Sequence, residues 1–141
     1  MSNVTKTTLI IGAAALIFGA TVSANPTFAK GGDRTRVECK TESQTEDASM
    51  DARFESRNGR TKFDASYEAA AGDVGAELPV LVNGINIGTM VLDLAANGDL
   101  VGDMSFDSQP DENEPFPGNF PIGVGSGSTV KVGVLECSLR S

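Results

Sequence analysis

The sequence predicts an all-β protein, a single small antiparallel β-sandwich or partly closed barrel of about seven strands that follows a signal peptide. Three Asn-Gly dipeptides lie between apolar-rich runs, and Asn-Gly is the strongest short-range signal for a β-hairpin. In the surrounding runs, apolar and polar residues alternate with the period of two that is typical of strands. Beyond the first 24 residues, no segment has the pattern of an amphipathic helix.

Residues 1–24 have the three parts of a secretory signal peptide. Lys6 precedes the apolar run Leu9–Ala20, and small residues ending at Ala24 supply a cleavage site, with an alternative end at Ala29. The run is shorter than the roughly 18 to 20 residues of a membrane span. We therefore expect a bacterial protein exported to the periplasm or the extracellular space, with no stable membrane span after cleavage. Residues 25–34 would be a flexible N-terminal segment, and residues 35–141 the β-sandwich domain.

The first strand is expected at Arg36–Lys40. After it, the Asn-Gly turn at Asn58-Gly59 predicts a hairpin, and the alternation of residues on both sides fixes its register. With Arg57 opposite Arg60, an apolar face and a charged face separate cleanly, and opposite charges pair across the charged face. The apolar face holds Met50, Ala52, Phe54, Phe63, Ala65 and Tyr67, and the charged face holds Asp51, Arg53, Glu55, Lys62 and Asp64.

The second hairpin is expected over residues 78–94, around Asn83-Gly84. Its register would place Val80 opposite Ile87 and Val82 opposite Ile85. Both faces are apolar, as in a strand that is covered by a second sheet or a loop. Pro79 marks a strand start or an edge, because it cannot donate a ladder hydrogen bond. The residues assigned to the second face are Leu81, Met90, Leu92 and Leu94.

Two further strands complete the predicted fold. Asn97-Gly98 leads into a strand at Leu100–Phe106, either as a tight turn or as a longer loop with a shifted register. The last strand spans Thr129–Arg140, and its apolar phase changes at Gly133-Val134, which we interpret as a β-bulge.

In an exported protein, the two cysteines, Cys39 and Cys137, are most simply a disulfide that brings the first and last strands together. Two separate buried thiols are the alternative. A zinc site would be incomplete, since the chain contains no histidine and no CxxC motif.

The net charge and the lack of histidine argue against several functions for this chain. The chain has 11 basic and 19 acidic residues and a formal charge of −8, so nucleic acid is not an expected partner. The absence of histidine removes the commonest catalytic side chain near neutral pH. Between Phe63 and Val130 there are eleven acids and no Lys or Arg. This excess of negative charge either keeps an exported domain soluble or attracts cations or a basic partner.

The most unusual segment is the acidic Phe-Pro loop over residues 107–121. Its aromatic residues either pack back as a lid over one end of the sandwich or contact a partner. Its carboxylates could also hold Ca²⁺, although their spacing fits no EF-hand. The candidate ligand or partner residues are Asp107, Asp111, Glu112, Glu114, Phe116 and Phe120, of which the four acids are the calcium candidates.

Two weaker candidates remain. Arg53, Arg57, Arg60 and Lys62 form a basic strip that could bind an anionic group, or that is simply part of a solvated charged face. Asp103 and Asp107 are the carboxylates that a glycosidase-like hydrolase would use. No G-x-S-x-G motif supplies an activated nucleophile.

Several runs resemble small exported bacterial all-β proteins of uncharacterised function, over roughly residues 35 to 140. The resemblance lies in the hairpin residues 82–89, the loop residues 115–121 and the terminal run 130–135, and it implies no activity or catalytic residue. We therefore expect a monomeric, non-catalytic binding or surface module without cofactors, which presents residues 107–121 to an unknown protein or glycan. The alternatives are a carboxylate-dependent hydrolase and a calcium-stabilised structural protein of the envelope.

Overall fold

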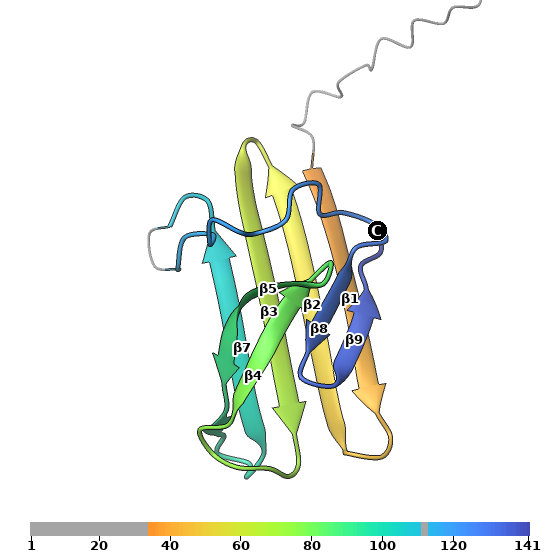
Figure 1. The fold of residues 1–141 in the computed structure, drawn as a ribbon, viewed down its shortest axis with the longest axis vertical. Helices are drawn as coiled ribbons and strands as arrows, with labels where there is room; N and C mark the ends of the chain where they lie inside the picture. The colour runs from red at the N-terminus through yellow and green to blue at the C-terminus, as the bar shows by residue number, and fades with distance from the viewer. Residues whose placement is uncertain (1–33, 111–112) are drawn as a thin grey trace, which may run out of the picture.

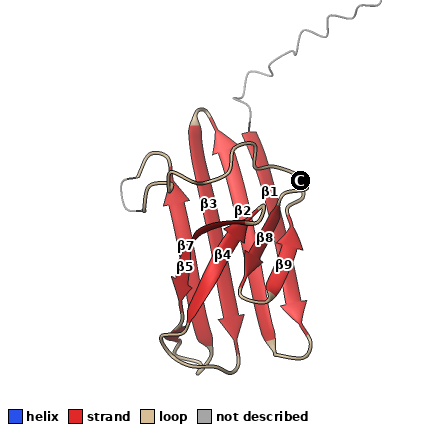
Figure 2. Cartoon of the chain, in the orientation of Figure 1, coloured by secondary structure: helices blue, strands red, loops and turns tan. Residues whose placement is uncertain are grey.

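The computed structural model describes residues 34–110 and 113–141, which form two antiparallel β-sheets packed face to face (Figure 1). One sheet has five strands in the order β1-β2-β3-β7-β6, and the other has four in the order β5-β4-β8-β9. Figure 2 shows only strands and loops in the described part of the chain. The strands are β1 (Arg34–Ser43), β2 (Ala48–Arg57), β3 (Arg60–Ala69), β4 (Glu77–Val82), β5 (Ile85–Val91), β6 (Asp93–Leu94), β7 (Leu100–Asp107), β8 (Thr129–Val132) and β9 (Leu135–Ser138).

Of the two expected architectures, the sandwich is therefore the one observed. The predicted signal peptide and the flexible segment over residues 25–34 lie outside the described residues, apart from Arg34, where β1 begins. No helix in the described residues is long and apolar enough to cross a membrane.

The first hairpin has the predicted register. Arg57 pairs with Arg60 and Phe54 with Phe63, and the pairing continues without a shift to Ala48 and Ala69. The apolar face points inward, and Phe63 is fully inaccessible to solvent. This register is fixed because a one-residue slip would turn the charged face toward the core. Asn58 and Gly59 both have positive φ, as a type I′ turn requires.

The second hairpin departs from the predicted register. Val82 does pair with Ile85, but Val80 pairs with Gly88 and not with Ile87, because the register shifts by one residue between Val80 and Leu81. The resulting β-bulge changes the phase of β5, so that Ile87 and Met90 are both buried. The expectation that Met90 lies on the opposite face from Val80 is therefore wrong: the shifted register puts Met90 on the same face as Val80, and both Met90 and Leu92 are buried.

The strand count rises from seven to nine because two predicted strands are each divided. After β5 the chain passes through Leu92 into β6, which belongs to the other sheet and pairs with β7 across the Asn97-Gly98 turn. This turn is the longer loop, since Asp93 and Leu94 pair with Val101 and Leu100.

The predicted bulge at Gly133-Val134 is instead a second division. Val132 pairs with Leu135, so these two residues form the turn between β8 and β9. Gly133 has φ 58°, the conformation that the first central position of a type II′ turn needs. A hairpin and a bulge both change the apolar phase, which is why the alternation alone did not distinguish them.

The two long sides of the sandwich are closed in different ways. On one side the Cys39–Cys137 disulfide joins β1 to β9. Just after β9, Arg140 forms paired backbone hydrogen bonds of 2.9 and 3.0 Å with Glu38 of β1. On the other side β5 lies close against β7, where Gly102 leaves room for the side chain of Met90. Only a residue without a Cβ atom fits at Gly102, because that atom would lie 2.6 Å from Met90 Cγ.

Candidate functional site

The Phe-Pro loop begins at Asp107, the last residue of β7, whose side chain is completely buried. Arg60 Nε lies 3.0 and 3.1 Å from the two carboxylate oxygens, and Arg60 Nη2 lies 2.6 Å from Oδ2. Lys62 Nζ lies 3.4 Å from the same Oδ2 atom. A planar guanidinium that meets a carboxylate in this bidentate way forms one of the stronger hydrogen-bonded pairs in proteins. The sequence predicted Asp107 as a loop ligand and gave no sign of this pairing.

The pairing holds the pKa of Asp107 far below its usual range. The hydrogen bonds from Arg60 are the largest cause, and they outweigh burial, which by itself raises the pKa. The backbone N–H of Gln109 donates a further hydrogen bond of 2.9 Å to Oδ1. Asp107 is therefore ionised at neutral pH, and it has no proton to donate as a general acid. Its oxygens are also already occupied, so it is poorly placed to serve as a calcium ligand.

The loop is closed at its base by backbone hydrogen bonds. The N–H of Asp107 donates to the carbonyl of Glu114 over 2.9 Å, and that of Ser108 donates to the carbonyl of Thr61 over 2.9 Å. In return, the N–H of Thr61 donates to Ser108 Oγ over 2.8 Å. The chain thus leaves the sheet after β7 and returns to the same place, in the short projection at the end of β7 in Figure 1.

After this projection, the two phenylalanines of the loop pack inward, as the lid interpretation predicted. Phe120 makes an edge-to-face contact with Phe63, with ring centroids 5.4 Å apart, and Phe116 makes one with Phe120 at 4.7 Å. Phe116 also packs on Phe106 at 5.8 Å. Such aromatic pairs contribute beyond their buried area, so the lid is part of the core.

The remaining acidic candidates are placed as follows. Asp111 and Glu112 lie outside the described residues, and Glu114 is exposed at the base of the projection. Among the residues that the structure describes, no group of three or more potential ligands has a geometry that could hold a metal ion. The calcium site stays a prediction.

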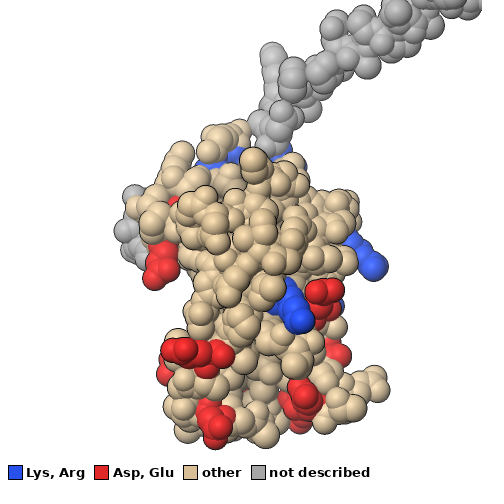
Figure 3. Space-filling model, in the orientation of Figure 1, with Lys and Arg blue, Asp and Glu red and all other residues tan. Residues whose placement is uncertain are grey.

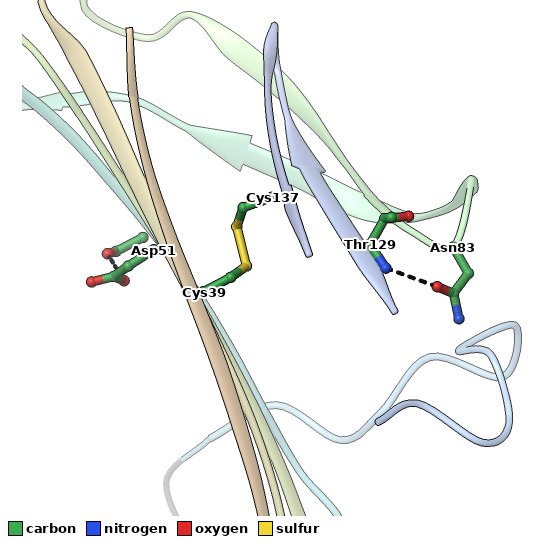
Figure 4. Close-up of a disulfide and its surroundings, with 6 residues drawn as sticks. Cys39, Asp51, Asn83, Thr129 and Cys137 are labelled. Atoms are coloured by element: carbon green, nitrogen blue, oxygen red, sulfur yellow. Dashed lines mark hydrogen bonds between the residues drawn. A yellow bond between two sulfur atoms is a disulfide. The ribbon is translucent and has the colours of Figure 1, made fainter. Parts of the chain in front are cut away.

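The disulfide joins the two sheets at their β1–β9 side (Figure 4). The Cα atoms of Cys39 and Cys137 are 5.8 Å apart, and the cysteines are 98 residues apart in the chain. The predicted pairing is therefore confirmed, and it joins the edges of two different sheets. Beside it lies a shallow polar groove of about 860 Å³, whose charged lining residues include Glu38, Lys40, Asp51, Arg53, Asp64, Glu136 and Arg140.

The predicted basic strip is mostly paired with acids. Arg53 lies 3.7 Å from Asp64, and both Arg60 and Lys62 contact Asp107. The exposed Arg53–Asp64 pair contributes little free energy. Arg57 is exposed beside a depression of about 340 Å³ that Glu55 and Gln109 also line. This arrangement agrees with the solvated charged face, and anion binding at the strip stays a prediction.

Folding also separates charge along the long axis of the molecule. The β2–β3 turn and the start of β1 lie at one end, where Arg34, Arg57 and Arg60 are aligned by the strand register. Acidic groups gather at the opposite end of the face drawn in Figure 3. There a cavity of about 310 Å³ is lined by four acids and by no Lys or Arg: Glu42, Asp47, Glu68 and Asp99. The linear sequence hid this polarity, because the residues come from separate strands and turns.

Comparison with known proteins gave no further guide to function. No family model, no curated protein and no solved structure matches this chain.

Proposed function

We propose that this protein is an exported, non-catalytic binding or surface module of the cell envelope that presents the Phe-Pro loop to a protein or a glycan. The observation that carries the proposal is the double anchoring of the loop. Asp107 fastens its start through Arg60, and Phe116 and Phe120 fasten its second half in the core. The exposed residues between these anchors are not part of the core, so their side chains are available to contact a partner.

Two features support export. A disulfide persists in oxidising compartments and is rare in the cytosol of most organisms. The predicted signal peptide, in a separate part of the chain, also indicates export to an oxidising compartment. Intact-mass measurement of the protein from its producing cells, with and without reduction, tests cleavage and the disulfide together.

The hydrolase alternative is weakened by the state of Asp107. A glycosidase needs one carboxylic acid that is protonated at the working pH, and the pKa of Asp107 is lowered by Arg60. Asp103 is exposed on the same strand. A screen with glycosides and esters in which Asp103→Asn abolishes turnover would restore this alternative.

The loop proposal is tested by replacing residues 109–113 with a Gly/Ser segment of equal length. The replacement keeps Asp107, Ser108, Glu114 and both phenylalanines, so the anchors remain. The matched control replaces residues 44–46, an exposed turn that contains Glu46 at the opposite end of the molecule, with a Gly/Ser segment of equal length. Cross-linking in the envelope of the producing cells, together with a glycan array, measures binding.

We expect the loop replacement to lower capture of a partner at least tenfold while the melting temperature changes little, and the control to retain capture. Equal capture by the wild type and the loop replacement would contradict the proposal. So would an equal loss in the control.

A further inference from the structure

The strand edges of the two sheets are protected unequally. A free edge presents unpaired backbone N–H and C=O groups, and proteins usually blunt it with charge, shortness or a covering segment. Among the described strands, β1 carries five charged residues and is partly covered by Arg140, β6 has two residues, and β9 lies against β1. The fourth edge is β5.

β5 packs on β7 through its inward-facing Gly88 and Met90, but it has neither charge nor shortness to protect its edge, only its bulge. Its seven residues, Ile85–Val91, include no charged side chain, and they pair only with β4. Ile85 and Val91, at its two ends, are apolar and are 41% and 49% exposed. Thr89 is exposed between them. An edge of this composition favours pairing with another strand.

The two ends of β5 differ in their surroundings. At the first end, the Asn119 side chain donates a 2.7 Å hydrogen bond to the carbonyl of Asn86, so the Phe-Pro loop adjoins the edge and already occupies one acceptor. The bulge lies at this end as well. The N–H of Gly88 donates a 3.0 Å hydrogen bond to Asn86 Oδ1 and is therefore also occupied. The open part of the edge is Thr89–Val91.

The second end is acidic. Glu77 pairs with Val91, Asp93 follows two residues later, and the Asp73 loop is tied to this region by a 2.7 Å bond from Gly75 N–H to the Leu92 carbonyl. No Lys or Arg occurs between Phe63 and Val130, so a second copy of β5 would bring no cation to this end. Charge complementarity thus favours a basic partner over self-pairing.

We propose that the open edge of β5 accepts an extended segment of another protein as an additional strand, and that this segment carries Lys or Arg beside Glu77 and Asp93. The inference rests on the proposed binding function and specifies its partner class. Backbone hydrogen bonds to Thr89–Val91 would supply the general affinity. The exposed Thr89 and Val91 side chains and the acidic end would select the sequence.

The probe is the acetylated, amidated peptide Thr-Val-Thr-Val-Thr-Lys-Lys, titrated into isotope-labelled protein at low salt. We expect saturable shifts in the amide resonances of Thr89 and Val91, and slower hydrogen exchange at the same residues. N-methylation of alternate peptide residues should abolish binding, because it removes the strand donors. Replacing both lysines of the peptide with glutamates should weaken binding at least threefold, an effect that salt removes.

Thr89→Pro should weaken binding at least tenfold, and Thr89→Lys, which adds the usual protection of an edge, should do the same if the proline variant is unstable. Shifts that map to residues 113–121 or 57–62, equal binding of the N-methylated peptide, or no binding would overturn the proposal. A dimer that Thr89→Lys dissolves would assign the edge to a second copy and would also overturn it.

The failures of the two proposals can be told apart. If the loop replacement retains every partner while Thr89→Lys loses the peptide, the loop proposal fails and the edge proposal stands. The reverse pattern removes the edge proposal alone.

Discussion

Arg60 and Asp107 lie 47 residues apart in the chain and form a bidentate ion pair in which the carboxylate is completely buried. The pair connects the first residue of β3 with the last residue of β7 and with the loop that follows. It therefore links the most regular part of the sheet to the most unusual segment of the chain.

Asp107→Asn should destabilise the protein clearly, because it leaves the cations Arg60 and Lys62 beside a neutral group. We expect the melting temperature to fall by more than about 5 °C, since shifts of this size accompany the loss of a buried charge partner in small domains. Asp64→Asn is the matched control, because its partner Arg53 is exposed and 3.7 Å away. Similar melting temperatures for both variants would contradict the anchoring role.

The same pair predicts a pH dependence. Folding lowers the pKa of Asp107 below its value of about 3.9 in an unfolded chain. The ionised carboxylate therefore stabilises the fold fully above that value, and the stabilisation is lost as the pH falls toward the folded pKa. In urea unfolding, the gap between wild type and Asp107→Asn should be constant from about pH 7 to 5 and shrink below about pH 4. A constant gap down to pH 2 would refute this account.

Removal of the disulfide should lower the free energy of unfolding by about 4 to 5 kcal/mol in the chain-entropy model, given the 98-residue separation of its cysteines. Urea unfolding of the Cys39→Ser/Cys137→Ser double variant measures the effect. A loss below about 1 kcal/mol would mean that the Glu38–Arg140 backbone hydrogen bonds hold the sheets together without the covalent link.

Gly102→Ala tests the close packing of β5 on β7. The added Cβ would lie 2.6 Å from Met90 Cγ and 2.9 Å from Leu92 Cδ2, so we expect a destabilisation of about 1 to 3 kcal/mol from overpacking. Gly118→Ala is the control, since nothing lies within 4 Å of its added Cβ. Chemical denaturation of both variants gives the comparison, and equal stabilities would show that Met90 can move aside at little cost.

Local sequence determined the parts of this protein in which neighbouring residues decide the outcome. Asn58-Gly59 and the alternation on both sides of it sufficed to predict the register from Arg57–Arg60 to Met50–Tyr67, because any slip would bury the charged face. The disulfide followed from there being only two cysteines and from the predicted export.

Tertiary structure alone decided the features that depend on contacts between distant segments. The bulge near Gly88 and the division of the last strand at Gly133 depend on how β5 and β9 meet the opposite sheet, and alternation of apolar residues cannot resolve them. In the sequence, nothing distinguishes Asp107 from the other acidic residues of the loop; its ion pair forms only because β3 places Arg60 beside it. The open edge of β5 is a property of strand order, which no local pattern encodes, because an edge exists only where a sheet ends.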